Sequence, residues 1–117
     1  MSDINTNNDD PVLSEEYLMG LLCSAGSARS ATMEAMKLAR SGNINDSLIL
    51  LDEADKMLNK VHSDQTYLIG LDEGEGKITM TLILTHIQDH IMTGMLCRDI
   101  ANEIIELYRI NKAKNDA

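Results

Sequence analysis

Three side chains that can do chemistry are grouped within one short segment: His86, Asp89 and His90. Residues three and four positions apart share one face of an α-helix, so this spacing places all three side chains together. Their neighbours Ile87 and Ile91 are apolar, and polar groups in such surroundings are costly to bury without partners. The segment therefore predicts more than a solvated polar face.

Three interpretations compete at this level. A His-x-x-Asp-His turn offers three metal ligands, and such sets suit Zn²⁺ and other transition metals. A neutral histidine can also act as a nucleophile that accepts an acyl or phosphoryl group. Finally, a polar cluster can fix the register of a helical bundle. The local pattern alone leaves all three open.

Three long helices must position this segment, and glycines separate them. Apolar spacing of three and four residues predicts helices over about residues 15–40, 44–68 and 78–110, with Gly42 ending the first and Gly70 the second. Consecutive helices with short connections pack antiparallel, so the fold class is all-α, an up-down-up three-helix bundle. We expect a disordered acidic leader over residues 1–12, one domain over residues 13–112 and a flexible tail over residues 113–117.

The third helix is apolar nearly all round. Two companion helices cannot cover so long and so apolar a helix, which predicts an oligomer with this helix at the subunit contact. Its three stripes are Leu84, Ile87, Ile91, Gly94, Ala101, Ile105 and Tyr108; Ile83, His86, His90, Thr93, Cys97, Ile100 and Ile104; and, at heptad spacing, Leu82, Asp89 and Leu96.

The composition of the 117-residue chain excludes several classes of partner. A net charge of −9 disfavours nucleic acid and anionic lipid. No apolar run approaches the roughly 18 residues of a membrane span, and the polar N-terminus is unlike a secretory signal. Cys23 and Cys97 form no CxxC pattern, so we expect reduced thiols and a cytoplasmic protein.

The run His86-Ile-Gln-Asp-His-Ile-Met-Thr93 resembles the signature of the lactose/cellobiose-type IIA proteins of the phosphoenolpyruvate-dependent sugar phosphotransferase system. Residues 25–30, Ala-Gly-Ser-Ala-Arg-Ser, and residues 62–66, His-Ser-Asp-Gln-Thr, resemble two further motifs of that family. The similarity extends from about residue 15 to residue 110. One departure is Ile87, where the family usually has Gly or Ala, and we expect it to affect partner docking rather than chemistry.

The resemblance implies a phosphocarrier for uptake of β-glucosides of the cellobiose, lactose or chitobiose type. It makes His86 the phosphoacceptor, HPr the phosphoryl donor and a cysteine of a IIB component the acceptor, with the membrane involved only through the IIC permease. It also implies a homotrimer in which three chains form a nine-helix bundle, with Asp89 as a metal ligand near the three-fold axis. Sugar specificity would belong mainly to the membrane partner.

This picture gives the neighbouring polar residues physical roles. Gln88 and His90 lie within reach of phosphoryl oxygens on His86, in the same or an adjacent subunit. Three Asp89 carboxylates on an axis would repel one another, so either one shared Mg²⁺ neutralises them or some take up a proton. For His62 we expect capping near the end of the second helix. Arg29 would pair with acidic residues such as Asp52 or Asp55, or stay in solvent.

The alternative function is a helical metal-binding or adaptor protein without transfer activity.

Overall fold

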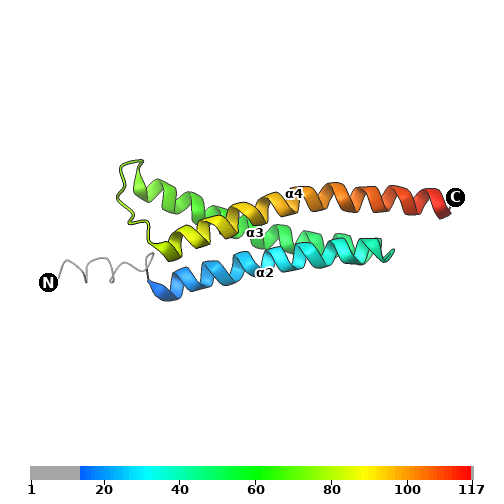
Figure 1. Ribbon diagram of the computed structural model, residues 1–117, viewed down its shortest axis with the longest axis horizontal. Helices are drawn as coiled ribbons and strands as arrows, with labels where there is room; N and C mark the ends of the chain where they lie inside the picture. Colours follow the sequence, from blue (N-terminus) through cyan, green and yellow to red (C-terminus); the bar gives the residue numbers. More distant parts are fainter. Residues whose placement is uncertain (1–13, 117) are drawn as a thin grey trace.

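The computed structural model describes residues 14–116 and shows three helices, α2 (Glu15–Arg40), α3 (Ile44–Asp72) and α4 (Leu82–Asp116). They lie side by side and run up, down and up, with the α3–α4 loop and the start of α2 at the same end (Figure 1). No strand occurs in this part of the chain. The predicted antiparallel three-helix bundle is confirmed. The predicted leader over residues 1–12 lies outside the described residues.

Both ends of α2 are where the sequence places them. The Ser14 hydroxyl oxygen accepts a hydrogen bond of 3.1 Å from the Tyr17 N–H, which satisfies one of the free donors at a helix start. At the other end Gly42 has φ +88°, and its N–H donates to the Ala39 carbonyl at 3.0 Å. Such a left-handed glycine with a backward-directed N–H is a common helix stop.

The end of α3 differs from the prediction. The helix continues past residue 68, through Gly70, to Asp72. A glycine inside a helix costs only about 1 kcal/mol, which packing readily offsets. The stop comes instead at Glu73, which is left-handed with φ 54° and donates its N–H to the Ile69 carbonyl.

The start of α4 is also later than predicted, at Leu82 instead of residue 78. The Asp72 carboxylate accepts hydrogen bonds from the N–H groups of Gly76, at 3.3 Å, and Ile78, at 2.8 Å. Those bonds hold the segment as a loop. The Thr81 hydroxyl then accepts from the Leu84 N–H at 3.2 Å, so Thr81 acts as the N-cap.

The far end of α4 exceeds the prediction, because the helix reaches Asp116 instead of stopping near residue 110. Residues 113–116, predicted to form a tail outside the domain, are helical. Neither Gly nor Pro follows Gly94 in the sequence, so nothing local ends the helix. Lys112 Nζ also donates to the Gly42 carbonyl at 2.7 Å, which joins this extension to the α2–α3 turn.

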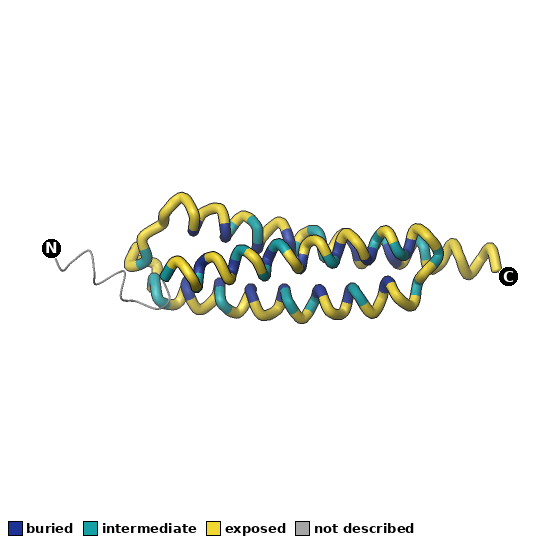
Figure 2. Tube along the Cα trace, turned by 90° about the horizontal axis from the view of Figure 1, so that it is seen from below, coloured by how far each residue is buried: buried dark blue, intermediate teal, exposed yellow. Residues whose placement is uncertain are grey.

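The core lies along the inner faces of all three helices (Figure 2). The α2 helix contributes mainly small residues, which allow close approach of its neighbours. On α4 the buried positions are those of the first predicted stripe. The largest fully buried side chains are Leu58, Leu84, Ile87, Ile91, Ile105, Val61, Thr32 and Ser47.

One predicted core position on α3 is wrong. Leu48 is 44% exposed, whereas the adjacent Ser47 is fully buried. The Ser47 hydroxyl donates to the Ala35 carbonyl at 2.6 Å. A small hydrogen-bonded side chain at this position lets α3 approach α2 closely, and that contact turns Leu48 outward.

Two glycine substitutions should change stability in opposite directions. Gly42→Ala should lower the free energy of unfolding by about 1–2 kcal/mol, because an L-residue pays that cost in the left-handed region. Gly20 lies inside α2 with nothing within 4 Å of an added Cβ, so Gly20→Ala should raise it by about 0.5–1 kcal/mol. Urea titrations at one fixed protein concentration would measure both, and equal shifts of the same sign would contradict the assignment of the α2 stop to Gly42.

Candidate functional site

The structure brings two of the predicted site residues into contact. The rings of His86 and His90 have centroids 4.4 Å apart and are tilted by 58°. Both residues come from α4, one turn apart, as their spacing requires. His86 is exposed, while His90 is half-buried, so His86 is the imidazole that an approaching molecule can reach.

His90 carries an unpaired polar atom. Its Nδ1 is buried and has no hydrogen-bond partner among residues 14–116. A buried ring nitrogen without a partner is costly, and native structures usually supply one. A water, a bound group or another molecule could supply the partner for this nitrogen.

Asp89 lies on the opposite side of α4 from the chain's own core. Taking about 100° per residue, Asp89 is roughly 160° from both Ile87 and Ile91, which are fully buried. Leu82 and Leu96 follow the same line as Asp89 and are 88% and 59% exposed. The predicted heptad stripe is therefore an outward-facing row with a carboxylate at its centre.

Gln88 lies on the other flank of that row from the two histidines. His86 and His90 stand about 60° and 100° to one side of Asp89, and Gln88 stands about 100° to the other. Within one chain, then, Gln88 cannot share a ligand with His86. Its side-chain oxygen instead accepts a hydrogen bond of 2.5 Å from Nε2 of Gln65 on α3.

Gln65 belongs to the His-Ser-Asp-Gln-Thr motif at residues 62–66, but sequence reasoning gave it no role. Its side chain is only 6% exposed, and it occupies the α3 core stripe between Val61 and Leu68. The available signal was a glutamine in an apolar stripe, where a polar amide requires a partner. Its partner, Gln88, is 23 residues away in the sequence.

Gln88 also borders an apolar pocket at the α3–α4 loop. The pocket has a volume of about 400 Å³. Side chains of both helices and of the loop line it, among them Leu68, Ile69, Ile78, Met80 and Leu84. The amide pair therefore sits at the edge of a low-dielectric hollow, where a hydrogen bond is electrostatically stronger than in water.

A metal site of the His-x-x-Asp-His type is not formed within one chain. No three His, Cys, Asp or Glu side chains in the described range 14–116 are grouped so that they could hold a metal ion. Asp89 is exposed beside the histidines but diverges from them around the helix. A site on Asp89 would thus need carboxylates from other copies of the chain.

Several other predictions are corrected by the structure. His62 is exposed and lies well before the end of α3 at Asp72, so it does not cap that helix. Asp55 pairs with Arg98 at 3.2 Å, and Asp52 pairs with Lys56 at 3.2 Å. Arg29 is exposed, which agrees with the second of its two expected outcomes, a side chain in solvent.

Ile87 is fully buried. It contributes to the core, so any effect on docking would act through packing of α4, and the expectation about docking stays a prediction. Cys23 and Cys97 are free thiols, as predicted.

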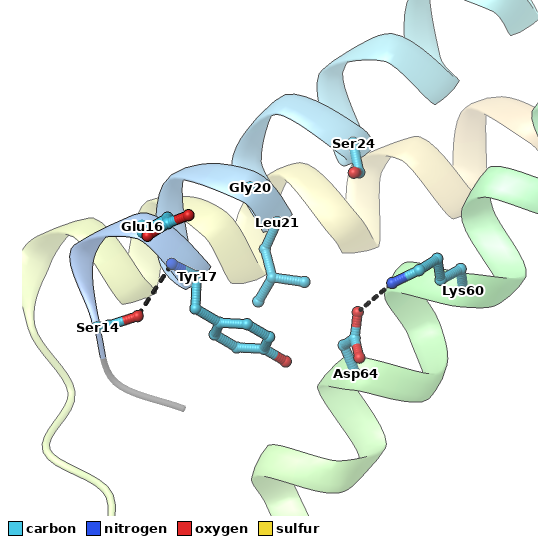
Figure 3. A pocket seen from close by; sticks show the side chains of 8 residues that line it. All are labelled: Ser14, Glu16, Tyr17, Gly20, Leu21, Ser24, Lys60 and Asp64. Atoms are coloured by element: carbon cyan, nitrogen blue, oxygen red, sulfur yellow. Dashed lines mark hydrogen bonds and ion pairs between the residues drawn. The ribbon is translucent and has the colours of Figure 1, made fainter. Parts of the chain in front are cut away.

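A second pocket lies apart from the histidines, between the start of α2 and α3 (Figure 3). Tyr17 and Asp64 both line it, and Lys60 Nζ lies 3.5 Å from the Asp64 carboxylate. Burial, together with the nearby Asp64 carboxylate, raises the pKa of Tyr17 above its usual value. No histidine lines this pocket.

Across residues 14–116, none of the helices combines the length and the apolar character needed to cross a lipid bilayer.

Comparison with known proteins gives a consistent result. Residues 16–109 match the family model described as "PTS system, Lactose/Cellobiose specific IIA subunit". The N,N'-diacetylchitobiose-specific EIIA component of Escherichia coli (strain K12) is 43% identical over 99 residues, which cover 85% of each chain. The lichenan-specific phosphotransferase enzyme IIA component of Bacillus subtilis (strain 168) is 40% identical over 94 residues, covering 80% of this chain and 86% of that one.

Solved structures agree with the sequence matches. The cellobiose-specific enzyme IIA from Bacillus anthracis superimposes with a TM-score of 0.79 at 32% identity, covering 86% of this chain and 92% of that one. The IIA(chitobiose) protein in complex with HPr, from Escherichia coli, gives a TM-score of 0.73 at 42% identity, covering 84% and 95%.

Proposed function

The chain belongs to the lactose/cellobiose-specific IIA family of the phosphotransferase system, and from this premise we propose that it carries a phosphoryl group on His86. A IIA component is a phosphotransferase of sugar uptake, and this chain has that role. The observation that carries the residue assignment is the exposed His86 ring in contact with the ring of a half-buried His90. The adaptor alternative gains no support from these contacts.

Transfer requires a ring nitrogen of His86 that is free and unprotonated. That nitrogen attacks the phosphorus atom of phosphorylated HPr, and the bond between phosphorus and the donor's nitrogen breaks as the new bond forms. The thiolate of a IIB cysteine then attacks the same phosphorus, and the bond to His86 breaks. Positioning and charge stabilisation account for most of the catalysis in such transfers. The related IIA(chitobiose) protein was solved in complex with HPr, which supports HPr as the donor.

We further propose that the working unit is a homotrimer with α4 at its centre, nine helices in all. Large apolar side chains on α4 are exposed in the single chain: Leu82, Ile83, Met92, Leu96, Ile100 and Leu107. An apolar face of this size on one helix is typical of an interface between subunits. With Asp89 toward a three-fold axis, the two flanks of α4 face neighbouring copies.

This arrangement completes the site across the subunit boundary. The His86 and His90 flank of one copy meets the Gln88 flank of the next, because the two flanks lie on opposite sides of Asp89. Gln88 would then contact phosphoryl oxygens on the His86 of its neighbour. His90 would contact the same phosphoryl group from within the chain.

The three Asp89 side chains fit one Mg²⁺ ion on the axis. Each is an exposed carboxylate that faces away from its own bundle, and each chain supplies one. Mg²⁺ prefers oxygen ligands and keeps several waters, which matches one carboxylate from each copy. When bound, the ion would neutralise carboxylates that otherwise repel one another.

We place the protein in the cytoplasm, in keeping with HPr and a IIB component as its partners.

His86→Ala should abolish phosphorylation, because His86 is the exposed imidazole of the His86–His90 pair and the one that a donor protein can reach. His90→Ala should reduce the transfer rate by about ten- to a hundredfold, the value of one hydrogen bond to a charged group. The measurement is intact mass after incubation with HPr and its donor enzyme, where the wild type gains one acid-labile phosphoryl group. His62→Ala is the matched control and should react at the wild-type rate. Full labelling of His86→Ala would rule out the assignment.

Mixing two defective variants should restore transfer. His86→Ala lacks the acceptor, and Gln88→Ala lacks the contact that its neighbour needs. In each mixed trimer, one subunit boundary joins an intact His86 to an intact Gln88. Random reassembly should therefore recover about a quarter of the wild-type rate. A mixture no faster than Gln88→Ala alone would show that the site lies within one chain.

Removal of the axial charge should alter assembly. Metal analysis of the purified protein should find about one Mg²⁺ per three chains, the ratio of a single axial site. Asp89→Leu should lose the ion while remaining trimeric and becoming more resistant to dissociation by chelators. Asp52→Leu, a change of the same charge on exposed α3 surface, should leave both properties unchanged. No bound ion in the wild type, together with an Asp89→Leu trimer that chelators dissociate as readily as the wild type, would refute the metal site.

A further inference from the structure

We propose that Gln65 is a positioning residue, whose buried amide holds the Gln88 side chain so that its NH₂ group points to the phosphoryl group on the neighbouring copy's His86. The proposal rests on the function and assembly proposed above. It adds the amide of Gln65, on α3, as the group that supports the amide of Gln88, on α4. Gln65 itself does not touch the phosphoryl group.

Gln65 is a polar residue in an apolar stripe, which indicates a role other than packing. It is 6% exposed on the core stripe of α3, where Val61 and Leu68 are 1% and 3% exposed. Leucine in that stripe would pack without any polar requirement, whereas a buried amide is destabilising unless it is hydrogen-bonded. Within residues 14–116, its side chain makes one hydrogen bond, of 2.5 Å, from its Nε2 to Oε1 of Gln88.

That bond decides which end of the Gln88 amide is available. A glutamine side chain has one acceptor oxygen and one NH₂ donor. Gln65 uses the oxygen of Gln88, so the NH₂ group of Gln88 remains for another partner. Phosphoryl oxygens only accept hydrogen bonds, so they require this orientation. The reversed amide would oppose oxygen to oxygen and repel the phosphoryl group.

The bond also restricts a flexible side chain before the reaction begins. A free glutamine samples many rotamers, and ordering it costs up to about 2 kcal/mol. Gln65 belongs to the rigid core of α3, and Gln88 stands on α4 at the flank that meets the neighbouring His86. Holding the donor in place before transfer removes that ordering step from the barrier.

Two substitutions of Gln65 separate orientation from packing. Gln65→Met keeps the length of the side chain and removes the hydrogen bond. It should lower the rate constant of transfer from saturating phosphorylated HPr by about three- to tenfold, with KM for HPr unchanged. Gln65→Glu replaces the donor with an acceptor and turns the Gln88 amide around. It should lower that rate constant by about ten- to a hundredfold.

The decisive comparison is made in a Gln88→Ala background. Neither Gln65 substitution should lower the rate further there, because nothing remains to be positioned. Leu68→Met, a packing change one turn along the same stripe, is the matched control and should leave the rate within about twofold in both backgrounds. As a spectroscopic check, the side-chain NH₂ resonances of Gln88 should shift on phosphorylation of the wild type and should not shift in Gln65→Glu.

The possible outcomes distinguish a failure of the role of Gln65 from a failure of the proposed function. If the wild type gains no phosphoryl group on His86, the proposed function fails. If the wild type is labelled but Gln65→Met reacts at the wild-type rate, or if its defect persists undiminished in the Gln88→Ala background, only the role of Gln65 is overturned. Urea titration of each variant measures its free energy of unfolding. It thereby identifies any loss of transfer rate that is caused by lower stability instead of by amide orientation.

Discussion

The whole structure depends on burial of α4. This helix carries large apolar side chains around most of its circumference, and its own chain covers only the face centred on Ile87 and Ile91. The hydrophobic effect acts on the rest as strongly as on that face, since it is proportional to apolar area. Large apolar side chains such as Leu82 and Leu96 are therefore left exposed on α4, in line with the polar residue Asp89.

The helix gives His86 a fixed neighbour. Its ring lies 4.4 Å from that of His90, centroid to centroid, and His90 has a buried nitrogen without a partner among residues 14–116. Weakly polar surroundings strengthen each hydrogen bond that reaches a charged group. The same surroundings penalise a badly oriented amide, which makes the pairing of Gln65 with Gln88 significant. The chain has a net charge of −9, which repels anionic groups. Hydrogen-bond donors that are already oriented toward the site before the anion arrives offset this repulsion.

The three-helix frame supplies rigidity by simple means. Small residues on α2, among them Ala25, Ala28 and Ala35, are fully buried and let α3 and α4 approach closely. Gly94 lies on the inner face of α4, and a Cβ there would meet Leu58 at 3.3 Å. The Asp72 carboxylate fixes the loop that leads into α4. The register of α3 against α4 is thereby defined, and this register places Gln65 beside Gln88.

The sequence by itself determined the number of helices, the exact span of α2, the buried stripe of α4 and the grouping of His86 with His90. Helix formation and helical spacing are local properties, so a periodic pattern is sufficient to predict them. Its motifs also indicated the family, because they specify residue types at fixed local intervals.

The tertiary structure decided what depends on residues far apart in the chain. The stop of α3 at Asp72 and the start of α4 after Thr81 follow from a loop held by a carboxylate, not from the nearest glycine. Asp55 pairs with Arg98 on another helix. Above all, Gln88 turned toward Gln65, away from its own chain's His86. Such pairings arise from the register between packed helices, which no spacing within a single helix contains.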